Sequence, residues 1–214
     1  MDAKGRRTHV LTEADLTTVG AHGIARSYPK NTIIVSEGDA TDSLYIILEG
    51  RVKAFVSDDD GNEMVLSTQG QGEYFGEMVL DEGPRSASVV TLEPSRFLVV
   101  PKAEFRNFLL SNPSFAISLI DKLISRVRSL TASVKSLALM DVYGRVARLL
   151  LELAEEQHGG GYVIAQRLTQ QDIASRIGAS REMVSRILKD LADGGYLTQS
   201  RTNIVLHRKP PEHW

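Results

Sequence analysis

The residues best suited to chemistry lie in the stretch Tyr74–Val89, YFGEMVLDEGPRSASV. Gly76 and Glu77 predict the start of a short helix, whose first N–H groups attract an anion. Arg85 and Ser86 follow within nine residues and supply a guanidinium fork and a hydroxyl, two groups that bind phosphate. The Glu77 carboxylate suits phosphate poorly, but it can accept a hydrogen bond from a sugar hydroxyl. The stretch therefore predicts a site for a phosphate attached to a sugar.

The same residues also allow a purely structural interpretation. Glu77 and Arg85 can form a surface ion pair beside a β-turn at Gly83-Pro84. An exposed pair of this kind contributes only ~0.2–1 kcal/mol to stability. The two interpretations differ in what Arg85 contacts, and the residue types alone leave both open.

A second motif, over residues 169–191, predicts two short helices joined by a tight turn. The predicted helices span Gln170–Ile177 and Arg181–Leu191. Thr169 and Asp172 match a capping box at the start of the first helix. Gly178 suits the turn, and Ser180 is a good N-cap for the second helix. Two short helices around a three-residue turn are typical of a DNA-binding helix-turn-helix.

The outer face of the second predicted helix carries the groups that contact DNA. An arginine at the start of such a helix can bind guanine O6 and N7, and a glutamate can accept from cytosine N4. The alternatives are that Glu182 favours the helix dipole and that Arg186 pairs with Glu182, which contributes only ~0.2–0.5 kcal/mol. Residues 142–214 hold 10 basic against 8 acidic residues, a net of +2, and residues 1–141 a net of −4. The outer residues are Arg181, Glu182, Ser185, Arg186 and Lys189.

Between the two motifs, the stretch Pro113–Met140 contains no glycine and no further proline. Six of its apolar residues alternate at spacings of three and four, which indicates a coiled-coil seam. The alternative is an ordinary core helix of one domain. At ~1.5 Å per residue this helix is about 40 Å long, so we expect it to join two domains and to pair two chains. The seam residues are Ile120, Leu123, Val127, Leu130, Val134 and Leu137.

The rest of the chain predicts short strands before the long helix and short helices after it. A helix is expected over residues 10–24, with Thr12 and Asp15 in a capping box, and another over Lys102–Ser111. Asp141 is expected to cap a helix that runs from Val142 to Gln157. Evenly spaced strands with turn residues between them indicate a sandwich or barrel. The strands are expected at 33–35, 43–48, 51–57, 63–68, 87–92, 96–100, 196–199 and 204–207.

Composition excludes several classes of protein. The chain of 214 residues has no cysteine, which excludes iron–sulfur clusters and thiolate zinc sites. No apolar run is long enough for a membrane span, and the first residues show no secretory signal. The histidines are His9, His22, His158, His207 and His213. Because none falls between residues 23 and 157, we expect no metal site, no haem and no metal-dependent jelly-roll enzyme there.

Two groups of residues resemble known families. FGEM…GPRSA is similar to the phosphate-binding cassette of cyclic-nucleotide-binding jelly-roll domains, and SLYIILEGRVKAF resembles the strand pair before it. SREMVSRILKDL and LALMDVYGRVARLLLELA resemble the recognition helix and the hinge of the cyclic-AMP receptor protein (CRP/FNR) family of bacterial transcription regulators. The resemblance covers about residues 28–207. It implies a cytoplasmic, homodimeric regulator that is not an enzyme and that binds DNA and RNA polymerase.

The resemblance also implies a fold and its boundaries. The chain is expected to be α+β, with an N-terminal double-stranded β-helix (jelly roll) that binds a cyclic nucleotide over residues 1–112. A dimerisation helix and hinge are expected over 113–141, with the hinge near Met140–Val142. A C-terminal winged helix-turn-helix is expected over 142–214. Two such units in a dimer imply a palindromic, TGTGA-like DNA site.

Finally, the resemblance assigns residues to the ligand and to DNA. Cyclic AMP is the first choice of effector, and cyclic di-GMP or a regulator without ligand comes next. Leu130 and Thr131 occupy the place where cyclic-AMP-binding members carry two hydroxyls, so the specificity for adenine stays open. The implied ligand-binding residues are Gly76, Glu77, Met78, Arg85, Ser86, Ala87, Leu130 and Thr131. The implied DNA contacts add Thr169, Gln171, Ser180, Ser200 and Arg201 to the outer face.

Overall fold

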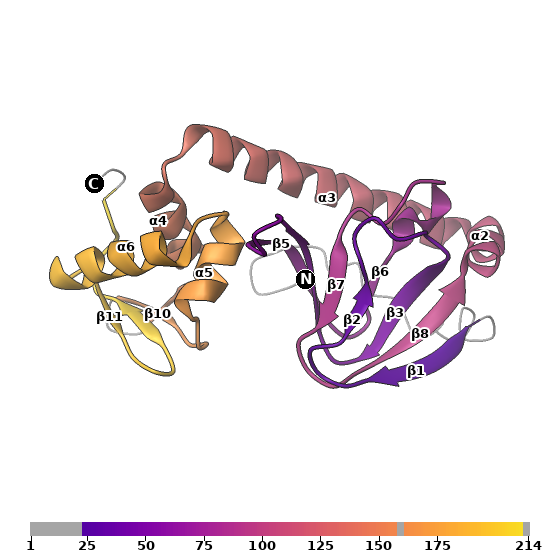
Figure 1. The fold of residues 1–214 in the computed structure, drawn as a ribbon, viewed down its shortest axis with the longest axis horizontal. Helices are drawn as coiled ribbons and strands as arrows, with labels where there is room; N and C mark the ends of the chain where they lie inside the picture. Colours follow the sequence, from indigo (N-terminus) through magenta and orange to yellow (C-terminus); the bar gives the residue numbers. More distant parts are fainter. Residues whose placement is uncertain (1–22, 158–160, 212–214) are drawn as a thin grey trace. The chain divides into compact units, whose positions relative to one another are not determined.

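The structure is a computed structural model that describes residues 23–157 and 161–211. The chain divides into two compact units (Figure 1). Of the described residues, the first unit contains 23–56 and 66–129, and the second contains 57–65, 130–157 and 161–211. The helix expected over residues 10–24 lies outside the described residues except at its end, where Ile24 begins a strand instead.

The first unit is built on two antiparallel four-stranded sheets (Figure 1). The first sheet has the order β1-β8-β3-β6, which is Ile24–Tyr28, Ser95–Pro101, Ser43–Glu49 and Tyr74–Phe75. The second sheet has the order β2-β7-β4-β5, which is Ile33–Val35, Ser88–Thr91, Val52–Ser57 and Glu63–Gln69. The predicted sandwich is therefore confirmed.

Alternating side chains give the first sheet two buried faces. Ile47 and Phe97 pack against residues of the second sheet, including Val52. Their neighbours Leu44 and Ile46 point to the opposite face, because successive side chains of a strand alternate. That face is covered by the 3₁₀ helix η1 (Glu77–Leu80) and by the helices α2 (Lys102–Ser111) and α3 (Pro113–Leu139).

Helix α3 is buried only near its start. Phe115 and Leu119 are 5% and 4% exposed and belong to the core beneath the first sheet. Further along the helix the apolar side chains are exposed, and their spacing is that of a coiled-coil seam. The six residues of this seam are exposed by 38–65%: Ile120, Leu123, Val127, Leu130, Val134 and Leu137.

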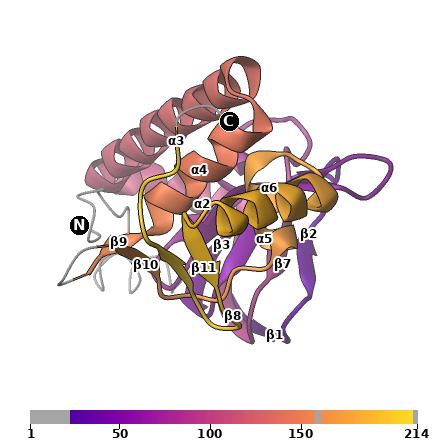
Figure 2. The same cartoon turned by 90° about the vertical axis from the view of Figure 1, so that its left-hand side faces the viewer.

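The second unit packs three short helices against a small sheet (Figure 2). The helices are α4 (Val142–Leu153), α5 (Gln170–Ile177) and α6 (Arg181–Asp193). The sheet has the order β11-β12-β10-β9, which is Leu197–Gln199, Ile204–Leu206, Tyr162–Ile164 and Glu155–Glu156. Leu150, Ile173 and Leu191 are fully buried in the shared core.

The sequence predictions failed where a short strand depends on a distant partner. The helix that begins at Val142 was expected to reach Gln157, but it ends at Leu153. Glu155 and Glu156 instead pair with Val163 and Tyr162, so sheet pairing overrides their helix propensity. Strands β1 and β6 were missed because β1 is an exposed edge strand and β6 has only two residues.

None of the described helices is long and apolar enough to cross a membrane.

Lys122 attaches α3 to the first unit. Its Nζ donates a hydrogen bond to the backbone carbonyl of Tyr74 and lies 3.4 Å from the centre of the Tyr74 ring. Burial lowers the pKa of Lys122 to about 8, although Glu77 and Glu73 nearby favour its charged form. A charged lysine at this place is therefore costly, but it fixes the helix beside strand β6.

We expect Lys122 to make the stability of the first unit depend on pH. Between pH 8 and 10.5 the unfolded chain binds a proton that folded Lys122 has released, so the stability it contributes rises with pH there. Below pH 8 the lysine is charged in both states and its contribution is constant. The difference in unfolding free energy between the wild type and Lys122→Met should therefore rise by about 1–3 kcal/mol, in favour of the wild type, from pH 8 to 10.5.

Urea unfolding at pH values between 7 and 10.5 measures this difference, with hydrogen exchange of the amides in the first unit as the readout. Lys135→Met is the control, because Lys135 lies on the same helix and is exposed. A difference between wild type and Lys122→Met that stays constant from pH 7 to 10.5 would contradict the assignment.

Candidate functional site

A cavity in the first unit collects the first motif. Its lining includes six of the residues assigned to a ligand from the sequence: Gly76, Glu77, Met78, Arg85, Ser86 and Ala87. Glu77 and Met78 belong to η1, as expected for a short helix after Gly76. Thus residues seven to eleven positions apart in the chain meet at one place.

Gly76 can occupy its position only because it lacks a side chain. Its φ angle is 83°, in the left-handed region that favours glycine. A Cβ at this position would lie 2.7 Å from Nη1 of Arg85 and 3.1 Å from the carbonyl oxygen of Ser43. The glycine therefore brings the backbone close to the arginine and turns the chain into η1.

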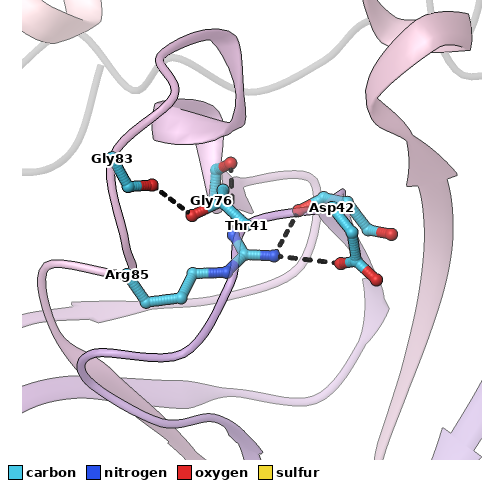
Figure 3. Close-up of polar contacts among 6 residues, drawn as sticks. Thr41, Asp42, Gly76, Gly83 and Arg85 are labelled. Carbon is cyan, nitrogen blue, oxygen red and sulfur yellow. Dashed lines mark hydrogen bonds and ion pairs between the residues drawn. The ribbon is translucent and has the colours of Figure 1, made fainter.

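Arg85 is the buried cation of the cavity, with 6% of its surface exposed. Figure 3 shows its guanidinium among three oxygen acceptors. Nη2 donates to the carbonyl of Ser43 at 2.8 Å and lies 3.5 Å from Oδ1 of Asp42. Nη1 lies 3.5 Å from the carbonyl of Gly76. Since Asp42 is the carboxylate that pairs with Arg85, the surface ion pair between Glu77 and Arg85 is not the arrangement found.

The loop that carries Arg85 is held by the loop before β3. The hydroxyl of Thr41 donates to the carbonyl of Gly83 at 2.8 Å (Figure 3). The N–H of Arg85 donates to the carbonyl of Asp39, and its carbonyl accepts from the N–H of Gly38, both at 2.9 Å. These backbone bonds position the arginine before any ligand enters.

The sequence predictions missed two polar residues of the cavity, Gln69 and Arg126. Gln69 ends strand β5, whose sequence EMVLSTQ does not alternate and gives no signal that its last residue lines a cavity. Arg126 lies on α3 and brings a second guanidinium, so two cations and Glu77 line one cavity. The apolar part of the lining consists of Val35, Ala54, Phe75 and Val89.

Leu130 and Thr131 are not among the lining residues of this cavity. They follow Arg126 on α3 by four and five positions, and Leu130 is 40% exposed. Their role toward a ligand stays a prediction. Within the described ranges, no group of three or more His, Asp or Glu side chains could hold a metal ion.

The second motif folds as its capping residues predict. Thr169 accepts from the N–H of Asp172, and the Asp172 carboxylate accepts from the N–H of Thr169, which completes the capping box. Gly178 ends α5 with φ 64°, as the tight turn requires. Ser180 caps α6 by accepting from the N–H of Met183 at 3.2 Å.

Helix α6 separates its buried face from its outer face. Val184, Ile187, Leu188 and Leu191 are at most 9% exposed. Among the ion pairs between described residues, none joins Glu182 to Arg186, so the intrahelical pair is not found. Of the outer residues, Ser185 is partly buried and the other four are exposed. The exposed ones are Arg181, Glu182, Arg186 and Lys189.

The other predicted DNA contacts also lie on the surface of the second unit. Thr169, Gln171 and Ser180 are exposed at the two helix starts. In the β11–β12 hairpin, the Ser200 hydroxyl accepts from the N–H groups of Thr202 and Asn203. Ser200 therefore forms the turn, and Arg201 beside it is exposed.

Two family models match the chain. Residues 25–112 match the cyclic nucleotide-binding domain, and residues 144–210 match the Crp-like helix-turn-helix domain. The first match contains the cavity, and the second contains α5, α6 and the hairpin after them.

Several bacterial regulators are similar over most of the chain. The CRP-like cAMP-activated global transcriptional regulator of Mycobacterium tuberculosis is 33% identical over 84% of this chain and 82% of its own length. The cAMP-activated global transcriptional regulator CRP of Pasteurella multocida is 34% identical over 87% and 91%. Vfr of Pseudomonas aeruginosa, also a cAMP-activated global transcriptional regulator, is 33% identical over 92% and 96%.

Among solved structures, the c-di-GMP-responsive global regulator CLP of Xanthomonas campestris has the same fold. The TM-score is 0.79 at 29% sequence identity, over 91% of this chain and all of that one. This likeness, the two domain matches and the similarity of the regulators over most of the chain all agree with the expected order of jelly roll, long helix and winged helix-turn-helix. The chain therefore belongs to the CRP/FNR family of transcription regulators, which are DNA-binding proteins and not enzymes.

Proposed function

We propose that this regulator senses a cyclic nucleotide in the cavity of its first unit and binds DNA with α6 as a homodimer. The observation that carries the proposal is the convergence of Gly76, Glu77, Arg85 and Ser86 in one cavity. Arg85 and Ser86 would hold the cyclic phosphate, and Glu77 would accept from the ribose hydroxyl. Met78 and Ala87 would complete the contacts around the sugar.

Cyclic AMP is the first choice of ligand. Three relatives that align with most of the chain are named as cAMP-activated regulators. Arg85 and Arg126 in the cavity lining supply guanidinium groups for the cyclic phosphate. In this proposal Leu130 and Thr131 approach the base.

Cyclic di-GMP is the second candidate. The regulator CLP, which is named as responsive to that dinucleotide, shares the fold with a TM-score of 0.79. Two guanidinium groups in one cavity also suit a ligand with two phosphates. A direct comparison of the two ligands decides between them.

For DNA, the proposal assigns sequence recognition to the exposed face of α6. Arg181, Glu182 and Arg186 would contact base edges of a TGTGA-like half-site, and Ser185 lies between them. Side chains at the helix starts and in the hairpin would contact phosphates, together with Lys189. These are Thr169, Gln171, Ser180, Ser200 and Arg201.

The partner that fits the exposed seam of α3 is a second copy of the chain. An apolar stripe with alternating spacing packs best against the same stripe of another helix. Two recognition helices in such a dimer would lie ~34 Å apart and read a palindromic site. A ligand that binds one arrangement of the dimer more tightly than another shifts the population toward it.

The proposal keeps the boundaries predicted from the sequence. The ligand-binding domain comprises residues 1–112, the dimerisation helix and hinge 113–141, and the DNA-binding domain 142–214. The family also suggests RNA polymerase as a further partner and the bacterial cytoplasm as the place of action.

We expect Arg85→Lys to weaken the binding of cyclic AMP at least tenfold, because lysine keeps the charge but cannot donate two parallel hydrogen bonds. Isothermal titration calorimetry measures the affinity for cyclic AMP, cyclic GMP and cyclic di-GMP. Arg96→Lys is the matched control, since Arg96 is an exposed arginine of the same unit. If the wild type binds no cyclic nucleotide at millimolar concentration, the sensor half of the proposal is wrong.

We expect Arg181→Ala to cost ~1–3 kcal/mol on the specific DNA site and to relax its sequence preference. Lys189→Ala should instead weaken specific and random DNA alike and lower the slope of affinity against salt by about 1. Fluorescence anisotropy with both DNAs at several salt concentrations separates the two effects. An Arg181→Ala protein with unchanged sequence preference would refute the recognition assignment.

We expect Val134→Asp to raise the dissociation constant of the homodimer at least tenfold. Val134 is 65% exposed in the single chain, and a dimer would bury two unpaired carboxylates at this position. Ala132→Asp is the control, because Ala132 is exposed and lies on the other side of the helix. Sedimentation equilibrium measures both. Equal dissociation constants for the two variants would exclude this seam as the dimer interface.

A further inference from the structure

Gln69 is a polar residue in the cavity for which the proposed function has no role. It is the last residue of β5, and 8% of its surface is exposed. It belongs to the cavity lining together with Ala54 and Val89. Its Oε1 has no hydrogen-bond partner among the described residues. An amide buried in this way costs stability unless something else binds it.

The orientation of the amide follows from its neighbour. Nε2 donates to the backbone carbonyl of Tyr74 at 3.3 Å, and Nζ of Lys122 donates to the same oxygen. A carbonyl oxygen can only accept, so the amide nitrogen must face Tyr74. Oε1 is therefore the end of the amide without a partner, and it can only accept.

The free acceptor restricts the chemistry of its partner. An unpaired buried acceptor is costly, so a ligand with an N–H group at this place binds more tightly than one without it. A cyclic phosphate diester carries only acceptors and cannot serve. The ribose hydroxyl is assigned to Glu77. The remaining donor of a cyclic purine nucleotide outside its sugar and phosphate is on the base, most simply its exocyclic amino group.

We propose that Gln69 determines ligand specificity by accepting a hydrogen bond from the exocyclic amino group of the base. The apolar side chains of Val35, Ala54 and Val89 in the same lining suit the faces of a flat ring. This inference rests on the proposed function, since it assigns one more residue to the same cavity. Because Nε2 is held by Tyr74, the site selects for a donor and against an acceptor at this position of the base.

The test uses pairs of ligands that differ only in the amino group. The 3′,5′-cyclic monophosphate of purine riboside is cyclic AMP without its amino group, and cyclic IMP is cyclic GMP without its amino group. Calorimetry on the wild-type dimer should show that the amino form of at least one pair binds tenfold or more tightly. Equal affinities within both pairs overturn the proposal without any variant.

Gln69→Met provides the second arm, since methionine has a similar length and no acceptor of comparable strength. We expect this variant to bind the forms without the amino group as tightly as the wild type does, which also shows that its cavity is folded. Its preference for the amino form should fall to less than threefold. If Gln69→Met keeps the full preference, the acceptor is elsewhere and the proposal is wrong.

If Gln69→Met does not fold, Gln69→Leu takes its place with the same expectations. The two levels of failure are distinguishable. When the wild type binds neither these four nucleotides nor cyclic di-GMP, the proposed function itself fails. When it binds them but neither the ligand pairs nor the variant shows the coupling, only the role of Gln69 fails.

Discussion

The buried guanidinium of Arg85 is the constraint on which the ligand-binding unit depends. A cation inside a protein needs acceptors at short range, and here it has the carbonyl of Ser43 and the carboxylate of Asp42. Gly76 must then be a glycine, because a side chain would collide with Nη1. The loop before β3, the turn into η1 and the loop before β7 thus meet around one side chain. The proposed site for an anion is a consequence of how this charge is buried.

The same unit shows how a helix can belong to two environments. Phe115 and Leu119 bury the start of α3 in the core beneath the first sheet, and Lys122 attaches the next turn to the carbonyl of Tyr74. Tyr74 immediately precedes Phe75 and Gly76, so the anchoring point of the helix and the cavity share one short strand. A direct hydrogen bond therefore links β6 to α3. This connection is short and requires no chain of intermediate contacts.

Local signals in the sequence predicted the elements that local interactions determine. The capping box at Thr169, the N-cap at Ser180 and the glycine turn at Gly178 were all predicted and are all present. The six clustered residues of the cavity were also predicted, because they lie within one stretch of the chain. Gln69 and Arg126 were missed, since nothing in their own neighbourhoods shows that β5 and α3 reach the same cavity. The early end of α4 was missed for the same reason, as Glu155 pairs with a strand eight residues away.

Helix α6 divides its residues between two tasks that do not compete. Val184, Ile187, Leu188 and Leu191 are buried and maintain the fold, whereas the residues on the outer face contribute little to the core. Changes at the outer positions therefore leave the free energy of folding nearly untouched. In its proposed role as the recognition helix, α6 can therefore change its DNA sequence preference while the protein stays folded. In the laboratory, the same division makes α6 a suitable place for randomisation in search of new operator preferences.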